Sequence, residues 1–217
     1  RIGKQDSKWF MDYRNSDGSI AEMCGNGIRV MAKYLIENGH QGAGIFPIST
    51  RDGFKYLSAP ESGDITVNMG AIREVYGEIT VSANGKTWTG YNIDMGNPHA
   101  VVFVADLNEI GDLKIAPKVE PEDEYPDGVN VEFVEFLPNG ELKMRVHERG
   151  VGETKSCGTG TCAVALAATL VKGQRLPASW VINPPGGRLS AEIDSHNNAI
   201  LTGPAELVTE HDLSKYL

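Results

Sequence analysis

Two cysteines occur in matching contexts, each directly before a glycine-rich turn and an apolar segment. Cys24 begins the stretch CGNG, and Cys157 begins the stretch CGTG. The N-terminus of a helix has unpaired backbone N–H groups and a partial positive charge, which bind anions and lower the pKa of a thiol. Glycines let a ligand approach this backbone closely. Each stretch therefore predicts a reactive thiol beside an anion-binding helix N-terminus.

A pair of such thiols suits inversion at a carbon centre. One face of the carbon must lose a proton and the other face must gain one, and a single base would have to cross the molecule. A substrate carboxylate held between two helix N-termini would have its enolate charge stabilised by the same N–H groups. The pattern admits a two-base racemase or epimerase. The alternative for Cys24 and Cys157 is plain packing at a helix start, and core packing is what we expect of Cys162.

Polar residues precede the two cysteines at equal spacing. Asn15 stands nine residues before Cys24, and Glu148 stands nine residues before Cys157. Each ends a strand-like run where a polar loop begins, and such loops often carry ligand-binding groups. Arg149 is either a bidentate ligand for a substrate carboxylate or a solvated surface residue.

Three further polar residues, Asn97, His99 and Asn130, stand beside predicted strands. Asn-Pro at 97–98 is also a frequent start of a turn, and Asn130 alone is equally ambiguous. Their local sequence leaves the functional and the structural interpretation open.

Two segments predict helices, and they are the two that follow the cysteines. In the first, Arg29, Lys33 and Glu37 stand four apart on a narrow polar stripe, and Asn-Gly at 38–39 is expected to end the helix. The second, over 162–171, is apolar or small almost all round, which is typical of a helix enclosed by protein.

Most of the remaining chain predicts strands. Alternating or continuous runs rich in Val, Ile, Phe and Trp occur at 64–70, 100–107, 130–136, 141–148, 179–183 and 198–203. Asn-Gly pairs at 84–85 and 139–140 predict hairpins with type I′ turns.

The repeated order of cysteine, glycine-rich turn and helix predicts an α+β fold of two similar domains. Each would be a curved, mostly antiparallel sheet wrapped around one central helix. We place the first domain at 1–76 and the second at 77–204, with the boundary in the turn-rich stretch near Gly77.

The composition disfavours several classes of function. A net charge of −9 argues against a nucleic-acid partner, and no apolar run is long enough for a membrane span. Three cysteines without a CxxC pair do not form a secreted disulfide framework, so we expect a cytoplasmic protein. The histidines and cysteines lack metal-ligand spacing, so we expect no metal site.

Four segments together resemble the signature segments of the diaminopimelate epimerase family, in the same order. They are YRNSDGSIAEMCGNGIR at 13–29, DMGNPHAVVF at 94–103, GVNVEFV at 128–134 and ERGVGETKSCGTGTCA at 148–163, and the resemblance continues to LTGPAELV at 201–208. It implies an isomerase that interconverts LL- and meso-diaminopimelate without pyridoxal phosphate or another cofactor. Such an enzyme serves lysine and peptidoglycan synthesis, acts on a small molecule in the cleft between its two lobes, and tends to be a homodimer.

The resemblance also implies a role for each candidate residue. Cys24 and Cys157 would be thiolate base and thiol acid, with the roles exchanged in the reverse direction. The reacting α-carboxylate would be bound by Gly25, Asn26, Gly158 and Thr159. The distal carboxylate and amine would be held by Asn15, Asn97, Asn130 and Arg149, with Glu148 at the amino group. His99 and Glu148 would lie near the thiols and set their protonation.

Members of this family normally have several tens of residues before the point that corresponds to Arg1, including an asparagine that binds substrate. We therefore expect either that an N-terminal part is omitted or that this is a truncation inactive alone. The tail at 205–217 is expected to return to the first domain.

Two other functions stay open. A proline-racemase-like enzyme also has two cysteines at helix N-termini, although Asn26 and the run ERGVGET fit a diaminopimelate site better. A non-catalytic, redox-sensitive binding module would use the same thiols, and mild oxidation could then join Cys24 to Cys157.

Overall fold

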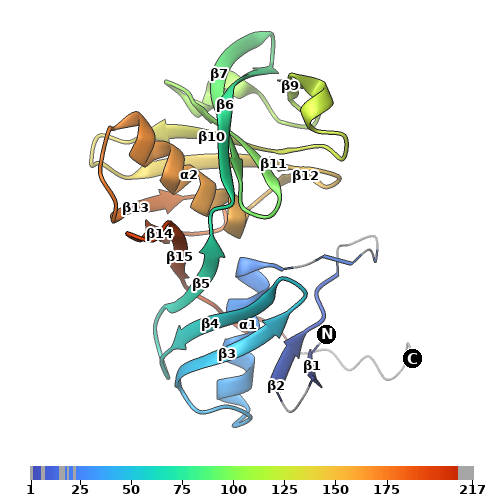
Figure 1. Ribbon diagram of the computed structural model, residues 1–217, viewed down its shortest axis with the longest axis vertical. Helices are drawn as coiled ribbons and strands as arrows, with labels where there is room; N and C mark the ends of the chain where they lie inside the picture. The colour runs from blue at the N-terminus through green and yellow to red at the C-terminus, as the bar shows by residue number, and fades with distance from the viewer. Residues whose placement is uncertain (1, 6–7, 15–17, 19, 22, 210–217) are drawn as a thin grey trace. The chain divides into compact units, whose positions relative to one another are not determined.

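The computed structural model describes residues 2–5, 8–14, 18, 20–21 and 23–209 (Figure 1). The chain forms two compact units, Arg1–Val67 with Pro204–Leu217, and Asn68–Gly203. The boundary after Val67 lies earlier than the one expected near Gly77. The strand that crosses it is β5 (Ile65–Ala71).

The first unit is a sheet with one helix, α1 (Gly25–Glu37). Its strands pair in the order β1-β2-β3-β4-β5, and all the recorded pairs are antiparallel except β2–β3. The first four strands are β1 (Ile2–Gln5), β2 (Lys8–Met11), β3 (Gly44–Thr50) and β4 (Gly53–Ala59). α1 contacts β4, and Ile28 and Leu35 of the helix are fully buried with Ile48 and Leu57 of the sheet.

The helix α1 ends where the sequence predicts, but one residue of its predicted polar stripe is buried. Asn38 is the C-cap and Gly39 takes a φ of 68°, a left-handed conformation that glycine adopts without strain. Lys33 and Glu37 form an ion pair of 3.0 Å, in which Glu37 is exposed and Lys33 is half-buried. Arg29, expected on the polar stripe, is instead only 4% exposed. Its guanidinium has partners inside the unit, described below, and these replace the water that it loses.

The second unit is a larger sheet around one helix, α2 (Gly158–Val171). From β5 the strand order is β15-β14-β13-β11-β10-β8-β7-β6-β9, with β12 paired to β11. All the recorded pairs of this unit are antiparallel apart from β8–β10 and β11–β13. The strands are β6 (Glu74–Ala83), β7 (Lys86–Asp94), β8 (Pro98–Phe103), β9 (Lys118–Glu120), β10 (Asn130–Phe136), β11 (Leu142–Glu148), β12 (Gly152–Thr154), β13 (Ala178–Asn183), β14 (Leu189–Ile193) and β15 (Asn198–Gly203).

The two faces of this sheet have different coverings. α2 packs on one face, where it contacts β7, β8, β10, β13, β14 and β15 (Figure 1). The other face carries a second core that includes Ala100, Val102, Val131 and Phe133. β9 and the 3-10 turn η1 (Leu107–Ile110) contribute side chains to this core, and so does Tyr125, which directly follows the 3-10 turn η2 (Glu122–Glu124). The predicted α+β fold, with a mostly antiparallel sheet around a central helix, is confirmed.

α2 is enclosed as predicted, and Cys162 within it is fully buried. The helix begins at Gly158, however, rather than at residue 162. The first turn is polar and glycine-rich, so the spacing of apolar residues does not identify it as helical. Cys157 caps this turn, and the cap offsets the low helix propensity of its glycines.

One of the two predicted turns has the expected type. Asn84 and Gly85 both have positive φ, at 48° and 72°, and join β6 to β7 as a type I′ turn requires. The prediction of type I′ at 139–140 is wrong: Gly140 alone has a positive φ, and its N–H bonds the carbonyl of Leu137. Pro138 at the second position favours a type I turn, which is followed here by a left-handed glycine.

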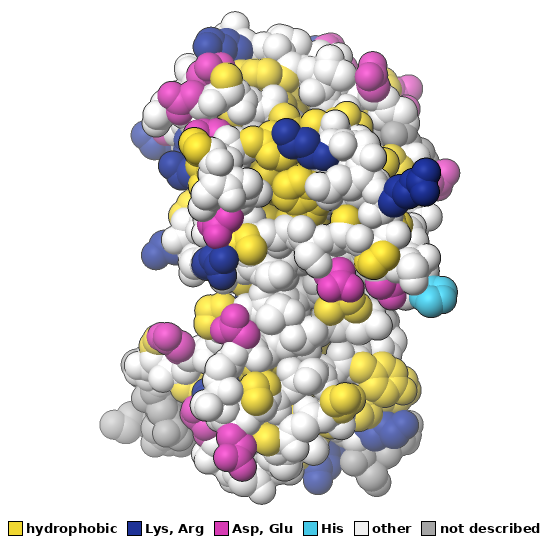
Figure 2. All heavy atoms as spheres, turned by 90° about the vertical axis from the view of Figure 1, so that its left-hand side faces the viewer, with side chains coloured by type: hydrophobic (Ala, Val, Ile, Leu, Met, Phe, Trp, Pro, Cys, Tyr) yellow, Lys and Arg dark blue, Asp and Glu magenta, His cyan; other side chains and the backbone are white. Residues whose placement is uncertain are grey.

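Neither of the two described α-helices has the combination of length and apolar character needed to cross a membrane. Figure 2 shows acidic and basic side chains interspersed over one face of the molecule.

Candidate active site

Cys24 is the N-cap of α1. Its backbone is extended, with φ −142° and ψ 113°, and its sulfur accepts the N–H of Gly27 at 3.3 Å. This is the hydrogen bond that a capping Ser or Asp oxygen usually makes. A thiolate is a better acceptor than a thiol, and it also lies at the positive end of the helix dipole. The N-terminus of α1 therefore places a hydrogen-bond donor and the positive end of the helix dipole at this sulfur.

Arg29 orders the first turn of α1 from within. Its guanidinium donates to the carbonyl of Gly25 at 3.2 Å and to Oδ1 of Asn26 at 3.0 Å. A third bond, of 3.4 Å, reaches the carbonyl of Pro204 in the segment that returns to this unit. Gly25 and Asn26, two predicted substrate-binding residues, are thus held in place beside Cys24 by a side chain assigned to the surface by sequence.

Cys157 caps α2 in the same way. Its backbone is extended, with φ −120° and ψ 121°, and its sulfur accepts the N–H of Gly160 at 3.4 Å. Thr159 adds a second contact, with its hydroxyl 3.5 Å from the sulfur. Two helices with unrelated apolar sequences therefore begin with the same thiol cap, which matches the repeat seen in the sequence.

The environment of Cys157 favours the protonated thiol. Burial is the main cause that raises its pKa above the ordinary value, followed by the charges of Glu148 and Glu132. The bonds from Thr159 and from the N–H of Gly160 act in the opposite direction but are smaller. The thiol is 8% exposed. Burial and the two neighbouring carboxylates therefore disfavour the thiolate form of Cys157.

Polar side chains from β8 and its preceding loop extend inward from this thiol. Nδ2 of Asn97 donates to the hydroxyl of Thr159 at 3.4 Å, and Oδ1 of Asn97 lies 3.2 Å from Nε2 of His99. Nδ1 of His99 lies 2.7 Å from Oε1 of Glu132. His99 and Asn130 are register partners on the parallel strands β8 and β10, and side chains alternate between faces, so His99 and Glu132 share the α2 face.

Glu132 is a site residue that the sequence analysis missed. It is fully buried, and a Cβ on Gly160 would lie only 2.3 Å from its Oε1, so the carboxyl fills the space beside the first turn of α2. One signal was available: Glu132 stands between Val131 and Phe133 in a run rich in apolar residues, and a charged residue there is unusual for a buried strand.

Asn130 and Glu148 lie at the same edge of the sheet but have internal partners. Asn130 is 3% exposed, donates to the carbonyl of Pro98 at 3.1 Å and accepts the backbone N–H of Arg149 at 3.1 Å. Glu148 accepts a short hydrogen bond from the hydroxyl of Thr154. The amide of Asn130 thus ties β8 to the end of β11, which fixes the backbone from which Arg149 projects.

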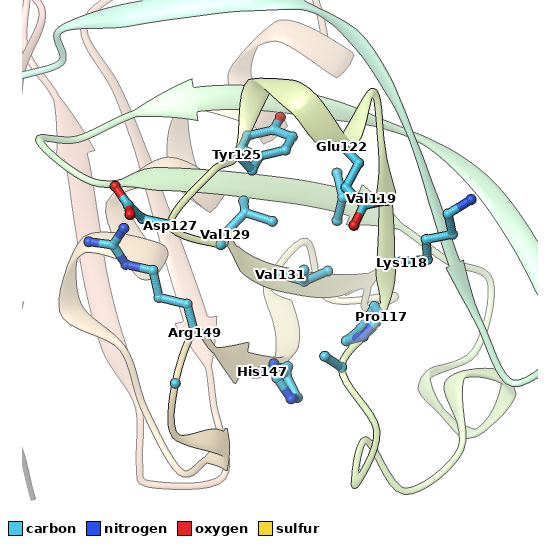
Figure 3. Close-up of a pocket in the computed structure, with 13 residues that line it drawn as sticks. Pro117, Lys118, Val119, Glu122, Tyr125, Asp127, Val129, Val131, His147 and Arg149 are labelled. Carbon is cyan, nitrogen blue, oxygen red and sulfur yellow. The ribbon is translucent and has the colours of Figure 1, made fainter. Parts of the chain in front are cut away.

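A cavity of about 280 Å³ occupies the other face of this sheet, between β9, η2 and the ends of β10 and β11 (Figure 3). Val131 and His147, which are register partners, line it, and they alternate with the residues that face α2. Among the described residues predicted to belong to the site, only Arg149 lines this cavity, from an exposed position. The cavity is therefore separate from the thiols.

The structure brings the predicted residues together within each unit. Cys24, Gly25 and Asn26 meet at the start of α1, while Asn15 lies outside the described residues. In the second unit most of the predicted residues gather around the start of α2: Asn97, His99, Asn130, Glu148, Cys157, Gly158 and Thr159. Arg149 is the exception, because it lines the separate cavity on the other face of the sheet. Within the described ranges, no group of three His, Cys, Asp or Glu side chains is arranged to hold a metal ion.

Comparison with known proteins gives one consistent family. The family model for diaminopimelate epimerase matches residues 3–75 and 91–208. The chain is 48% identical to a diaminopimelate epimerase of Streptomyces coelicolor, over 94% of this chain and 73% of the relative. It is 46% identical to that of Acidothermus cellulolyticus, over 94% of this chain and 67% of the relative.

Solved structures show the same fold at low sequence identity. A PhzF-family phenazine biosynthesis protein of Bacillus anthracis matches with a TM-score of 0.66 at 14% identity, over 93% of this chain and 79% of that one. A hydroxyproline epimerase of Agrobacterium vitis, solved with trans-4-OH-L-proline bound, matches with a TM-score of 0.64 at 18% identity, over 93% of this chain and 69% of that one.

Proposed function

The chain belongs to the diaminopimelate epimerase family and epimerises diaminopimelate, and we propose that Cys24 and Cys157 are the two acid–base groups of this reaction. The enzyme is an isomerase of lysine biosynthesis. In this proposal it converts the LL isomer to the meso isomer without a cofactor.

One observation supports the proposal above all. Both cysteines cap a helix with the sulfur on the N–H of the third residue, at 3.3 and 3.4 Å. A cysteine that merely filled space would have no reason to adopt this geometry twice, because Ser, Thr, Asp and Asn are the usual caps. Two thiols in matching settings would supply the acid and the base that proton transfer on two faces of one carbon needs, and this supports the proposal.

The proposed reaction moves two protons and no other atoms. One sulfur, as thiolate, takes the proton from the α-carbon, and the electron pair of that C–H bond passes to the carbon and its carboxylate. The other sulfur, as thiol, then delivers its proton to the opposite face, and the electron pair forms the new C–H bond. At the end the first sulfur is a thiol and the second a thiolate, so the next turnover in the same direction needs a proton exchange between the thiols and their surroundings.

The helix N-termini supply the electrostatics of this step. N–H groups in the first turns of α1 and α2, at Gly25, Asn26, Gly158 and Thr159, would bind the α-carboxylate. The same groups would stabilise the charge that develops as the α-proton leaves, which is commonly the largest single contribution to catalysis.

The distal end of the substrate needs its own recognition. We assign it to Asn15, Asn97, Asn130 and Arg149, with Glu148 at the amino group. Buried polar groups discriminate strongly against a substrate that lacks their partner, so this set would exclude proline. The internal hydrogen bonds of Asn130 support a second task for it, the alignment of the Arg149 backbone.

The decisive experiment incubates the full-length protein with LL-diaminopimelate in heavy water without pyridoxal phosphate. Deuterium is expected at one α-carbon, with formation of the meso isomer. Exchange into proline instead would show that the proline-racemase-like alternative is correct. No exchange into any amino acid would favour the binding module.

We further propose that the enzyme is a cytoplasmic homodimer, as expected from the family resemblance. Sedimentation of the purified full-length protein is expected to give twice the mass of the chain, and a monomer across the working concentration range would contradict this.

A further inference from the structure

Hydrogen bonds link Cys157 to a buried carboxyl. From the thiol they run through Thr159, Asn97 and His99 to Glu132, with distances between successive polar atoms of 3.5, 3.4, 3.2 and 2.7 Å. We call these five residues the Cys157–Glu132 chain. Both of its ends are ionisable, and both are enclosed: Cys157 is 8% exposed, while His99 and Glu132 have no exposed surface.

The inner end of the Cys157–Glu132 chain has one unused acceptor. Oε1 of Glu132 bonds His99, but Oε2 has no hydrogen-bond partner. A fully buried carboxylate with a free oxygen is costly, and protonation removes most of that cost. The contact of 2.7 Å between Nδ1 of His99 and Oε1 of Glu132 is short enough to hold a proton between the two atoms.

The groups around this region leave little to balance a second negative charge. α2 contains no charged residue over 158–171, and its face toward β13, β14 and β15 packs on apolar side chains. On β7 the register partner of His99 is Ile93. The charged groups that act on Cys157 are Glu132 on β10 and Glu148 at the end of β11, and both raise its pKa.

We propose that Cys157 and the His99–Glu132 pair share a single proton, so that the enclosed region keeps the same charge whichever of them holds it. This rests on the proposed acid–base function of Cys157 and adds Glu132 as a positioning residue. When Cys157 is a thiol, His99 is neutral and Glu132 is a carboxylate. When Cys157 is a thiolate, the same proton lies between His99 and Glu132, and that pair is neutral overall.

The hydrogen bonds support both states with one change among the heavy atoms, a half-turn of the Asn97 amide. In the thiolate state the hydroxyl of Thr159 donates to the sulfur, Nδ2 of Asn97 donates to Thr159, and Nε2–H of His99 donates to Oδ1 of Asn97. These are the Asn97 contacts that the structure contains. In the thiol state every donor points the other way, and the amide of Asn97 is turned so that its nitrogen and oxygen change places.

Both states contain three protons on these groups. The thiol state has them on the Cys157 sulfur, the Thr159 oxygen and Nδ1 of His99. The thiolate state has them on the Thr159 oxygen, on Nε2 of His99 and between Nδ1 of His99 and Glu132. The change from the thiol state to the thiolate state therefore moves the Cys157 proton to the His99–Glu132 pair without creating a second buried charge. Turnover needs such a proton acceptor.

The test is the pH dependence of Cys157 alkylation in Glu132→Gln, read by mass spectrometry of the peptide that contains Cys157. In the wild-type protein the alkylation rate is expected to rise in two steps. The first proton to leave produces the state in which Cys157 and the His99–Glu132 pair share one proton, and the loss of that proton leaves Cys157 as a thiolate in every molecule. Gln cannot bind the proton or hold a charge, so Cys157 is expected to lose its proton at lower pH, with an alkylation rate at least tenfold higher at a pH below the first wild-type step. Cys24, alkylated in the same sample, is the internal control and is expected to keep its profile.

Gln has nearly the size of Glu, so a purely structural role of Glu132 would leave the Cys157 profile unchanged, and an unchanged profile would overturn the proposal. If Glu132→Gln does not fold, the titration of the His99 ring by NMR in wild-type protein and in Cys157→Ser replaces it. The shared proton requires two steps in the wild type and one in the Ser variant. Identical titrations would refute it.

The outcome is independent of the substrate assignment. A wild-type protein that exchanges deuterium into diaminopimelate but has the same Cys157 profile with and without Glu132 would refute the shared proton alone. A protein that exchanges no amino acid but shows the two-step profile would refute the proposed catalytic role and leave the proton-sharing intact.

Discussion

Gly160 and Gly27 occupy equivalent positions, the third residue of α2 and of α1, and their surroundings differ sharply. A Cβ at Gly160 would lie 2.3 Å from Oε1 of Glu132 and 3.0 Å from its Cδ. A Cβ at Gly27 would lie 3.4 Å from the nearest atoms, Cβ and Sγ of Cys24, which is close to ordinary contact. Alanine at both positions therefore separates the effect of the buried carboxyl from the effect of losing a helical glycine.

Gly160→Ala is expected to destabilise the protein. Glu132 is fully buried and bonded to His99, so it cannot turn into solvent to make room. Overpacking of a close-packed interior costs about 1–3 kcal/mol. Replacing glycine by alanine inside a helix stabilises by up to about 1 kcal/mol, which leaves a net loss of about 1–2 kcal/mol. For a protein of this size that corresponds to a fall in Tm of roughly 2–8 °C.

The measurement is thermal unfolding followed by circular dichroism, with Gly27→Ala as the matched control. The control retains the helix contribution and lacks the clash, so its Tm is expected to equal the wild-type value or to rise by roughly 2–4 °C. If Gly160→Ala unfolds at the wild-type temperature, the carboxyl of Glu132 has space to move, and its enclosure beside α2 is wrong. A fall in Tm of the same size in both variants would point to the loss of the glycines rather than to the clash.

The other predictions concern the thiols, Arg29 and Tyr125. Replacing either Cys24 or Cys157 by Ala is expected to lower net epimerisation by at least about 100-fold, because a positioned acid or base contributes about that much or more. Cys162→Ala is the control and is expected to stay active. An active Cys157→Ala variant in the epimerisation assay would contradict the two-base mechanism. Arg29→Ala is expected to lower the free energy of unfolding, measured in urea, by about 1.5–3 kcal/mol, since hydrogen bonds from a buried charged donor are lost. An unchanged midpoint of urea unfolding would mean that the guanidinium does not hold α1. Burial, with a smaller effect from a neighbouring carboxylate, raises the pKa of Tyr125 to about 12. The folded state therefore binds the phenolic proton more tightly than the unfolded chain, so the stability from this group is complete below about pH 10 and is lost, by up to about 2 kcal/mol, as the pH rises to about 12. Tyr125→Phe, measured by urea unfolding across this range, is expected to remove that dependence, and an equal loss in both proteins would contradict it.

Much of the candidate site followed from local sequence. Cys24 and Cys157 are N-caps as predicted, because a cap is made by one residue and the three that follow it. The strands at 65–71 and 142–148 bury the alternate apolar residues that their pattern indicated. These features depend on neighbours in the chain, and so they can be read from the chain.

Arg29 and Glu132 show where such reasoning stops. The spacing of Arg29 on α1 predicted a solvent-facing stripe, but Arg29 is buried because its partners include the carbonyl of Pro204, far along the chain. Glu132 acquires its meaning from His99, which the parallel pairing of β8 with β10 brings beside it. Neither partner is indicated by local periodicity, which describes only one element at a time.

The sequence by itself determined that two thiols stand at two helix N-termini, because capping and helix periodicity are local. It also determined the family, through segments whose order and spacing are specific. Only the tertiary structure decided what surrounds each thiol: a buried guanidinium behind α1, and a buried histidine–carboxyl pair behind α2. The physical reason is that burial and charge depend on strands and segments that meet in space after long separations in the chain, and these set the protonation of a buried thiol more strongly than the residues next to it.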